Sequence, residues 1–383
     1  MRRKYLYLLA VAAMAAALVL VACGGDDDTT DAEADQSLAV TEDPGTKPDE
    51  LIIRIWGGGL QEGIEETCGN SFTESTGIPI KWDTSDEGAI HTKVNNAIRA
   101  GERPPVDASF QLVTRGYLNG VQGGLNIPIS PKVATNLDVV TESVAKPPVL
   151  PSDDGWEYTN VYGFMVPVII RTDRVNEGDI TTWEDLFDPR YKDAIEWDSQ
   201  YASTAFAIAR LLDVEVDADD PSSMDPVWEK IATAKPNIAI LGDDAASVKA
   251  LTEGEVDVSI HGIFNKIEAE EAGAPVANVV PEEGALLLGD AFYIHAGIPD
   301  DVAYYSQVFI NECLGAEQQT NIADTLGVIP VNPEATLPDY MEAEPRVFPV
   351  TAEQVAESAI VAPIAAMAQN QDEWQAAFDE AVK

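Results

Sequence analysis

The sequence predicts an α/β fold built from two lobes. Short apolar runs that suit strands alternate with segments in which apolar residues recur every three or four positions, as they do on one face of a helix. Glycines mark many of the junctions between these segments. Such alternation is typical of sheets with helical crossovers. The part of the chain that can fold, residues 51–383, is also longer than a single hydrophobic core normally fills.

The first lobe is expected to open with strands and helices in alternation. The predicted elements are a strand at Leu51–Trp56, a glycine turn, a helix carrying Ile64, Cys68 and Phe72 on one face and ending at Gly77, a strand at Ile78–Trp82, a helix carrying Ile90, Val94 and Ile98 and ending at Gly101, and a strand at Val106–Phe110. This order predicts an α/β sheet with crossover connections.

The middle of the chain contains a helix start. Thr181 is predicted to cap a helix there, with Glu184 closing a capping box and Asp188-Pro189 ending the turn. Helices are further predicted over residues 203–213, 245–253 and 301–314 and in the last 30 residues, with a strand over 256–260. No internal repeat recurs at a fixed period.

The N-terminus has the pattern of an export signal. Arg2, Arg3 and Lys4 precede an apolar run, Tyr5–Ala22. The run ends in Leu-Val-Ala-Cys, which resembles a bacterial lipobox, so residues 1–22 are expected to be a lipoprotein signal peptide and Cys23 the lipid-bearing residue that holds the protein at a membrane. The alternative is that Tyr5–Ala22 remains as a short transmembrane anchor. Residues 23–50 are expected to be a disordered acidic tether.

The chain is strongly acidic. It contains 23 basic and 66 acidic residues, and without the three basic residues of the signal the balance is 20 against 66, a net charge of −46. Nucleic acid is excluded as a partner on this ground. The charge favours solubility and is compatible with a saline habitat, but it does not identify a ligand.

Two cysteines remain once Cys23 is assigned to the lipid. Cys68 and Cys313 both lie on apolar helical stripes and are expected to face a core. Export permits a disulfide between them, but two buried free thiols remain the alternative.

The sequence offers little for catalysis, and neither a cofactor nor a metal is expected. Three histidines lack metal-ligand spacing, and no serine has a nucleophile-elbow context. Glu62 replaces the third glycine of a dinucleotide fingerprint, and no phosphate-loop motif occurs. Tyr304 and Tyr305 are adjacent on a predicted helix, which directs their side chains about 100° apart and favours packing over ferric-ion binding. We therefore expect that the protein is not an enzyme.

A series of short motifs covers nearly all of the chain after the tether. They are Trp56-Gly57-Gly58 with Gln61, Phe72–Gly77, Pro105–Asp107, Thr182–Leu186, Asp188–Lys192, Gly254–Val258, Ala272–Pro275, Val280–Gly284, Gly289-Asp290, Phe309–Asn311 and Pro330–Asn332. Together they resemble the motifs of the spermidine/putrescine-type substrate-binding proteins of ABC importers. Each motif is short, and their order and spacing carry the resemblance.

The resemblance implies a class II periplasmic-binding-protein fold. Residues 51–160 plus 291–330 would form lobe 1, and residues 163–290 plus 331–383 would form lobe 2, with hinge crossings near 162–166 and 289–294. It further implies a monomeric, extracytoplasmic receptor that delivers a small amine-bearing solute to ABC permease subunits. Alternatives are an anionic or zwitterionic solute, such as an opine or an aminophosphonate, or a secreted enzyme on the same bilobal fold.

Site residues follow from position and from the resemblance. Trp56 at a strand end could lie on an alkyl chain or a cation, or belong to the core. Gly57 and Gly58 could let the backbone approach a ligand at a helix start, or simply form a turn. By resemblance, Asp290 would receive the ligand's amine and Tyr162 would stand beside the first crossing; a solvated loop is the alternative for Asp290.

Other candidates mark departures from the family or follow from position alone. His261 stands where relatives often have tryptophan, and Tyr201 and Thr204 stand where polyamine binders tend to carry acids. These departures favour a smaller amine or a zwitterion over a long polyamine as the ligand. Ser85, Asp86 and Gln111 are candidates for the edge of the cleft.

Overall fold

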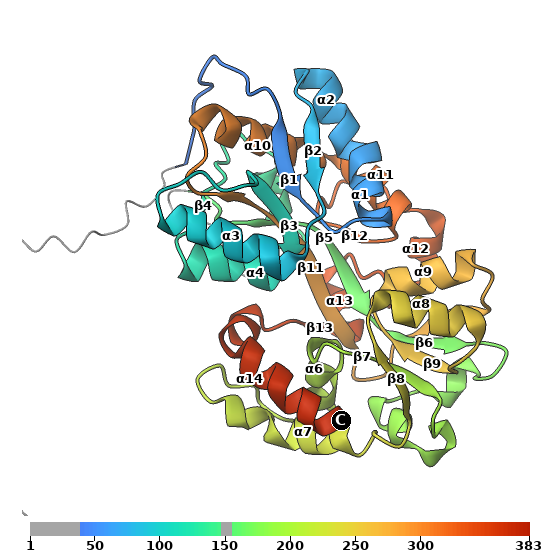
Figure 1. Ribbon diagram of the computed structural model, residues 1–383. Helices are drawn as coiled ribbons and strands as arrows, with labels where there is room; N and C mark the ends of the chain where they lie inside the picture. The colour runs from blue at the N-terminus through green and yellow to red at the C-terminus, as the bar shows by residue number, and fades with distance from the viewer. Residues whose placement is uncertain (1–38, 147–154) are drawn as a thin grey trace, which may run out of the picture. The chain divides into compact units, whose positions relative to one another are not determined.

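The computed structural model describes residues 39–146 and 155–383 and contains two β-sheets with helices around them (Figure 1). The proposed signal peptide, Cys23 and the tether up to residue 38 lie outside the described residues. The mixed α/β class expected from the sequence is confirmed. We call the eight-stranded sheet with its helices lobe 1 and the five-stranded sheet with its helices lobe 2. Within the described residues, no helix combines the length and the apolar character that crossing a membrane requires.

Lobe 1 is built on a mixed sheet in the order β12-β5-β11-β3-β1-β2, with β4 and β13 also pairing with β11. Its strands are β1 (Leu51–Arg54), β2 (Ile80–Asp83), β3 (Ala108–Leu112), β4 (Asn126–Ile127), β5 (Thr159–Val166), β11 (Ala285–His295), β12 (Ile329–Pro330) and β13 (Ala359–Val361). Strand β1 pairs in parallel with β2 and β3, as the predicted crossover connections require.

Lobe 2 has the strand order β10-β6-β9-β7-β8. Its strands are β6 (Val168–Arg171), β7 (Ile195–Asp198), β8 (Ile238–Gly242), β9 (Val258–Ile260) and β10 (Val276–Val279). Strand β7 pairs in parallel with β8 and β9, so the carboxyl ends of these three strands meet at one edge of the sheet.

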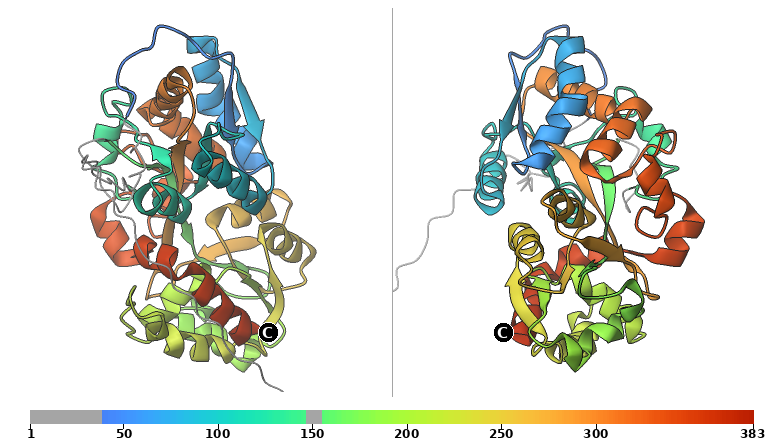
Figure 2. Two further views of the ribbon diagram at one scale, coloured as in Figure 1. Left: turned by 60° about the vertical axis from the view of Figure 1, so that its left-hand side comes forward. Right: turned by 90° about the vertical axis from the view of Figure 1, so that its right-hand side faces the viewer.

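Helices surround both sheets. The α-helices are α1 (Gly59–Ile64), α2 (Asn70–Thr76), α3 (Glu87–Arg99), α4 (Val113–Tyr117), α5 (Leu137–Val140), α6 (Ala202–Leu211), α7 (Asp225–Ala232), α8 (Asp244–Glu253), α9 (Ile263–Glu271), α10 (Asp300–Cys313), α11 (Ala316–Leu326), α12 (Asp339–Ala343), α13 (Ala352–Ser358) and α14 (Ile364–Val382). Figure 2 shows α2, α10 and α11 grouped in lobe 1 and α6, α7 and α14 grouped in lobe 2. The helices predicted over 203–213, 245–253 and 301–314 and near the C-terminus are confirmed to within about two residues at most of their ends.

The first predicted helix is present but is not a uniform α-helix. A π-helical turn, Glu65–Gly69, separates α1 from α2. Ile64, Cys68 and Phe72 are fully buried, as the four-residue repeat predicted. Gly77 ends the helix with φ at 76°, a left-handed conformation that glycine adopts without a Cβ penalty.

The capping box predicted at Thr181 is displaced by one residue. Thr182 is the cap, and Asp185 rather than Glu184 closes the box over a 3₁₀ helix, Trp183–Phe187. The Asp185 carboxylate accepts hydrogen bonds from the backbone N–H groups of both Thr181 and Thr182, at 2.8 and 2.9 Å. A shorter acidic side chain one residue later serves both donors, and Glu184 instead pairs with Lys230 at 2.7 Å.

Cys68 and Cys313, whose state the sequence left open, are joined by a disulfide with a Cα–Cα distance of 4.9 Å. The bridge connects the π-helical turn to the end of α10, 245 residues away in the chain. Phe72 lies one helical turn after Cys68, and Phe309 lies one turn before Cys313. Their rings pack edge to face, with centroids 5.6 Å apart. The bridge therefore fastens the early and late segments of lobe 1 to one another.

The last residues before β1 lie against lobe 1. The backbone carbonyl of Val40 accepts a hydrogen bond from Gln307 of α10 at 2.9 Å, and Val40 packs on the hydrophobic core. The Lys47 ammonium donates to the carbonyl of Thr76. Contacts with the lobe thus begin before Leu51, the residue at which the sequence predicted the fold to start.

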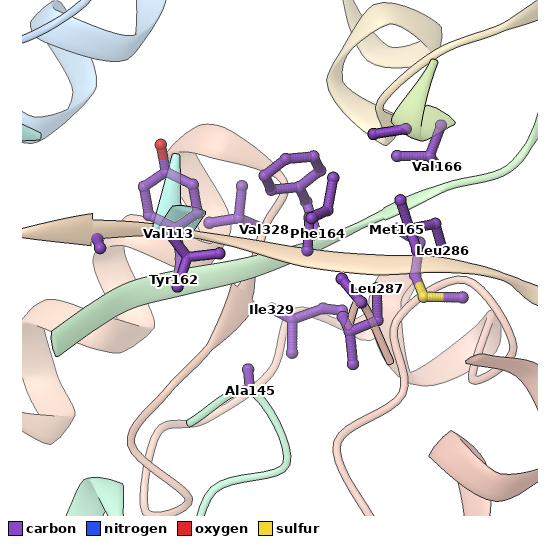
Figure 3. Packing of buried hydrophobic residues seen from close by; sticks show 14 of the residues in the cluster. Val113, Ala145, Tyr162, Phe164, Met165, Val166, Leu286, Leu287, Val328 and Ile329 are labelled. Carbon is purple, nitrogen blue, oxygen red and sulfur yellow. The ribbon is translucent and has the colours of Figure 1, made fainter. Parts of the chain in front are cut away.

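Two neighbouring strands, β5 and β11, run from lobe 1 toward lobe 2. They pair antiparallel from Val166–Leu286 to Thr159–Phe292, and every residue of both strands is buried. Figure 3 shows their apolar side chains packed together, among them Phe164, Met165 and Leu286. Only Pro167 separates β5 from β6, the first strand of lobe 2. The site residues predicted at this crossing are therefore held by a buried strand pair.

Candidate functional site

Asp290 and Tyr162 face each other across the β5–β11 pair. They are direct partners in the strand register, and a β-bulge follows at once between Asp290 and Ala291. The Tyr162 hydroxyl donates a hydrogen bond to Oδ2 of Asp290 at 2.6 Å. Both residues are buried, with exposed fractions of 2% for Tyr162 and 7% for Asp290. The loop environment considered for Asp290 is not what the structure shows.

The Asp290 carboxyl is held in an environment that resists a negative charge. Burial raises its pKa to about 7, although the hydrogen bond from Tyr162 opposes the rise. The negative charges of Glu87 in lobe 1 and Asp244 in lobe 2 raise the pKa further, and Arg54 lowers it. Within the described residues, Tyr162 supplies the one side-chain hydrogen bond to this carboxylate. A cationic group beside Asp290 would lower the free-energy cost of burying its charge. It could also donate hydrogen bonds to the carboxylate oxygens.

This environment predicts that Asp290 destabilises the unliganded protein at alkaline pH. A carboxyl whose pKa rises on folding lowers stability above its unfolded pKa of about 4, and the cost grows until the pH passes the folded value near 7. Asp290→Asn should therefore raise the free energy of unfolding by about 2 kcal/mol at pH 8 and by little at pH 4. Thermal unfolding of both proteins at the two pH values checks this, and an equal effect at both would contradict it.

On the lobe 1 side of the site, Arg54, Trp56 and Glu87 contact one another, and we call them the trio. The Arg54 guanidinium lies over the Trp56 ring, 5.0 Å from its centroid, and the Trp56 indole Nε1 donates to Glu87 at 3.2 Å. Arg54 is buried, donates to the carbonyl of Phe110 at 3.2 Å, and lies 3.8 Å from Glu87. Trp56 is half-buried and belongs to this trio. Arg54 and Glu87 therefore hold the Trp56 side chain in place, and part of it remains exposed.

The remaining lobe 1 candidates are Gly57, Gly58, Ser85, Asp86 and Gln111. Gly57 and Gly58 are exposed, and Gly58 has φ at 74° just before α1. Asp86 caps α3 by accepting from the N–H of Ala89 at 2.9 Å, and the N–H of Ser85 donates to Asp83. Gln111 is fully buried and accepts from the Tyr293 hydroxyl at 2.8 Å, while its Nε2 has no partner among the described residues.

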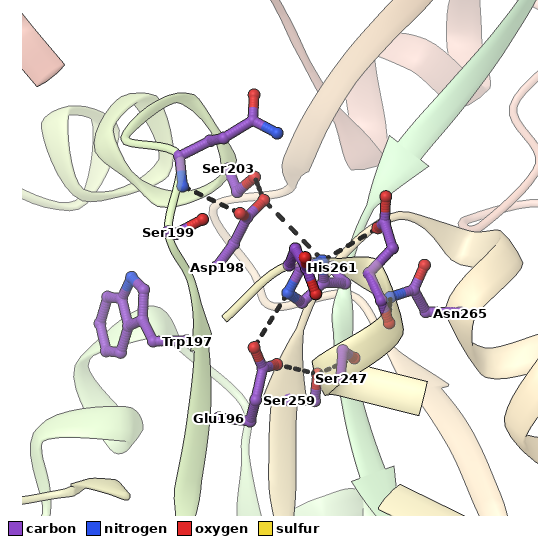
Figure 4. Close-up of polar contacts among 12 residues, drawn as sticks. Glu196, Trp197, Asp198, Ser199, Ser203, Ser247, Ser259, His261 and Asn265 are labelled. Atoms are coloured by element: carbon purple, nitrogen blue, oxygen red, sulfur yellow. Dashed lines mark hydrogen bonds and ion pairs between the residues drawn. The ribbon is translucent and has the colours of Figure 1, made fainter. Parts of the chain in front are cut away.

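On the lobe 2 side, His261 lies in a buried polar network at the carboxyl ends of β7 and β9 (Figure 4). Its Nε2 bonds to Glu196 at 3.0 Å and its Nδ1 to Asp244 at 3.2 Å. Glu196 also accepts from Ser259 at 2.6 Å, and Ser259 bonds to Ser247. Strand alternation points Glu196 and Asp198 toward His261 and sends the Trp197 indole to the other side, as Figure 4 shows.

The network holds His261 as a cation. Burial alone would lower the pKa of His261, but the hydrogen bonds that its ring donates to Asp244 and Glu196, together with the charges of Glu196 and Asp198, raise it to about 10. Burial raises the pKa of Asp198 to about 6, against the opposing effects of His261 and of hydrogen bonds from Ser203 and Gln200. One imidazolium thus faces three carboxyl groups, so lobe 2 contributes excess negative charge.

Tyr201 and Thr204 contribute to packing. The Tyr201 ring packs against Phe206, Trp228 and Trp374, with centroids 5.9 to 6.2 Å away. Thr204 is fully buried, and its hydroxyl accepts from Trp197 Nε1 at 3.1 Å. The structure therefore brings Tyr162 and Asp290 together and places Tyr201 within an aromatic cluster.

Four charged residues near the site were missed by the sequence analysis: Arg54, Glu87, Glu196 and Asp244. Arg54 interrupts an apolar strand, and Glu196 alternates with Trp197 in another, so both were visible as charged residues at buried positions. Glu87 and Asp244 begin helices, where acids are common, and only the tertiary structure distinguishes them.

Two cavities lie away from these residues. One, of about 860 Å³, is lined by β10, by Lys266 and Glu270 of α9, and by the segment after α12, including Arg346. The other, of about 560 Å³, lies between α2 and α11. Neither touches Trp56, Asp290 or His261, and no group of metal-binding side chains occurs in the part of the chain that the structure describes. The buried charges at the strand crossing remain the better candidate site.

The fold, with two β-sheets and helices around them, is that of periplasmic solute-binding proteins. Residues 68–349 match the family model described as bacterial extracellular solute-binding protein. The chain belongs to this family, whose members are solute-binding proteins of ABC transporters and not enzymes.

Relatives and solved structures agree with this assignment. The spermidine/putrescine-binding periplasmic protein of Salmonella typhimurium is 23% identical over 282 residues, covering 73% of this chain and 76% of the relative. The solved spermidine/putrescine-transporter substrate-binding protein of Streptococcus pneumoniae superposes with a TM-score of 0.68 at 18% identity, covering 88% of this chain and all of that one. A binding protein of Agrobacterium tumefaciens B6 in complex with glucopine gives the same TM-score and identity, covering 87% of this chain and all of that one.

Proposed function

We propose that this protein is an extracytoplasmic receptor that captures a small amine-bearing solute, such as putrescine or spermidine, and delivers it to ABC permease subunits. The observation that carries the proposal is the buried Asp290 carboxylate. Among the described residues it receives a single side-chain hydrogen bond, and both lobes contribute further negative charge near it. A protonated amine is the ligand that such a site favours. Relatives named for spermidine and putrescine support the same choice.

The receptor would work by closing its lobes around the ligand. The proposed hinge lies near residues 162–166 and 289–294. Residues 51–160 plus 291–330 would move as one body and residues 163–290 plus 331–383 as the other, so the second body would include β13 and the first part of β11, which pair within the lobe 1 sheet. A ligand that contacts Asp290 and both lobes stabilises the closed state by its additional contacts there. We further propose that the protein acts as a monomer, catalyses no reaction, and is anchored to the membrane by a lipid on Cys23.

Asp290→Asn tests the proposed function directly. The variant should weaken binding of putrescine or spermidine by about 1.5 to 3 kcal/mol, the usual contribution of a hydrogen bond to a charged group, or roughly 10- to 150-fold in Kd. Isothermal titration calorimetry at pH 8 measures it. The control is Asp220→Asn, which removes the same charge from an exposed cap that accepts from Ser222. Unchanged affinity in Asp290→Asn, or no binding of any amine to the wild type, would exclude this function.

A zwitterionic amino compound is the second candidate, and Arg54 favours it. This guanidinium is buried beside the site, and its Nε has no hydrogen-bond partner among the described residues. A ligand carboxylate near Trp56 could meet this positive charge while its amine meets Asp290. The glucopine complex of the related Agrobacterium protein fits this class. Titration with 4-aminobutanoate separates the two candidates, because the zwitterion would bind more tightly than putrescine only if Arg54 is the anchor.

A further inference from the structure

The Tyr162 side chain is placed to act on the ligand site through Asp290. It is almost fully buried, its ring lies among the apolar side chains of the strand crossing (Figure 3), and its hydroxyl donates to Oδ2 of Asp290 at 2.6 Å. Burial, and then the charge of Asp290, raise the pKa of Tyr162 well above its usual value, so the hydroxyl keeps its proton and remains a donor. Tyr162 can therefore position a binding group without touching the ligand itself.

The backbone fixes Tyr162 opposite Asp290. The two residues are direct partners in the β5–β11 register, and β5 has one extra residue, Val161, before the next pair. The carbonyl of Val161 accepts a hydrogen bond from the fully buried Gln319 of α11 at 2.9 Å. Bulges of this kind redirect side chains and are common beside functional sites. The contact between Tyr162 and Asp290 thus depends on a supported strand pair and not on a loop.

The charged groups that act on Asp290 leave Tyr162 as the main support of its ionised form. Glu87 of α3 and Asp244 of α8 disfavour the carboxylate, and Arg54 of β1 favours it. The Arg54 guanidinium is shared with other partners, since it donates to a backbone carbonyl of β3 at 3.2 Å and lies 3.8 Å from Glu87. Strand β3 pairs with β11 at Asp290, and its five described residues include no titratable side chain. Burial raises the pKa of Asp290 to about 7, and the hydrogen bond from Tyr162 is the largest influence that opposes this rise.

We infer that Tyr162 is a positioning residue, whose hydroxyl keeps the Asp290 carboxylate ionised and fixed in orientation and so sets the pH range in which the receptor captures its solute. This inference rests on the proposed amine-binding function and adds its regulation. The hydrogen bond occupies Oδ2 and leaves Oδ1 to accept from the ammonium of a ligand. At low pH a proton takes the place of the ammonium on Asp290, and the affinity falls.

The pH profile of putrescine binding tests this assignment. The affinity of the wild type should fall about ten-fold between pH 8 and pH 6, because a proton competes with the ammonium for Asp290. Tyr162→Phe keeps the ring and removes the hydroxyl, so the same fall should begin at a higher pH. The variant should bind putrescine about ten-fold more weakly than the wild type at pH 6.5 and within about three-fold of it at pH 9. Isothermal titration calorimetry measures both, and comparison at equal pH cancels the ionisation of the ligand.

Tyr293→Phe is the matched control. Tyr293 is a second fully buried tyrosine, lies on the same strand as Asp290, and donates its hydroxyl to Gln111 at 2.8 Å. Its loss should leave the affinity within about two-fold of the wild type at both pH values.

A titration without ligand tests the same hydrogen bond directly. Carbon-13 NMR of protein labelled at the aspartate carboxyl groups follows the ionisation of Asp290, and Asp290→Asn identifies its signal. The midpoint should lie at a higher pH in Tyr162→Phe than in the wild type or Tyr293→Phe. The assignment is overturned if Tyr162→Phe weakens putrescine equally at pH 6.5 and pH 9, leaves its affinity unchanged, or leaves the NMR midpoint unchanged. Failure of the amine-binding function is recognised separately, because neither putrescine nor spermidine would then bind the wild type at any pH.

Discussion

Replacing His261 by alanine is expected to lower the free energy of unfolding by about 3 to 5 kcal/mol. The reason is the carboxylate left behind. Glu196 is fully buried, and in the native protein the His261 imidazolium bonds to one of its oxygens at 3.0 Å while Ser259 bonds to the other. Without the imidazolium, Glu196 either keeps an uncompensated buried charge or takes up a proton, and both cost stability. Denaturant unfolding of the wild type and the variant at pH 7 measures the loss.

Two variants separate this charge effect from lost packing. His91→Ala removes a second buried histidine that carries no charge, since burial lowers its pKa to about 4, so it should cost clearly less than His261→Ala. Adding Glu196→Gln to His261→Ala removes the stranded charge and should recover part of the loss. A double variant as unstable as His261→Ala, or a His91→Ala loss of the same size, would show that charge is not the cause.

The same interaction predicts a pH window. The pKa of His261 is raised on folding, from about 6.5 to about 10. A group with a raised pKa of this kind contributes its full stabilisation below the unfolded value and loses it as the pH rises through the folded value. The stability difference between wild type and His261→Ala should therefore be largest below about pH 6.5 and shrink steadily between about pH 6.5 and pH 10. A difference that grows with pH would contradict the protonated state of His261.

The sequence predicted those parts of the fold that depend on interactions between residues close together in the chain. The buried stripe at Ile64, Cys68 and Phe72 and the left-handed glycine at Gly77 follow from periodicity and from backbone freedom. The π-helical turn within that helix had no such signal, because its residues suit an α-helix equally well. Near Thr181, either Glu184 or Asp185 could have closed the capping box. The shorter side chain of Asp185 accepts both backbone hydrogen bonds.

Less of the candidate site could be predicted from the sequence, because the pairing register of distant strands decides which of its residues are neighbours. Asp290 and Tyr162 were found through family resemblance, and only the β5–β11 register shows that they bond. The alternation around Trp197 could show that Glu196 shares a face with Asp198. It could not show that His261 lies beside them, since this requires the parallel pairing of Trp197 in β7 with Ile260 in β9. Long-range pairing, and not residue type, decides which acids meet.

Loss of the Cys68–Cys313 disulfide is expected to cost about 4 kcal/mol of stability. The bridge closes a loop of 245 residues, nearly two-thirds of the chain, so breaking it releases a large amount of conformational freedom in the unfolded state. Unfolding of the wild type with and without a reductant measures the cost without changing a side chain. The double variant Cys68→Ala/Cys313→Ala should fall at least as far, because two fully buried side chains also lose contacts.

The two ways of breaking the bridge distinguish loop closure from local packing. If loop closure dominates, single substitution of either cysteine should reproduce most of the loss seen in the double variant, since the first substitution already opens the loop. If packing dominates, reduction of the wild type should cost less than 1 kcal/mol and the two single losses should add. Because the bridge joins α10 to the helix that follows β1, the first outcome would mean that lobe 1 depends on this covalent link to hold its early and late segments together.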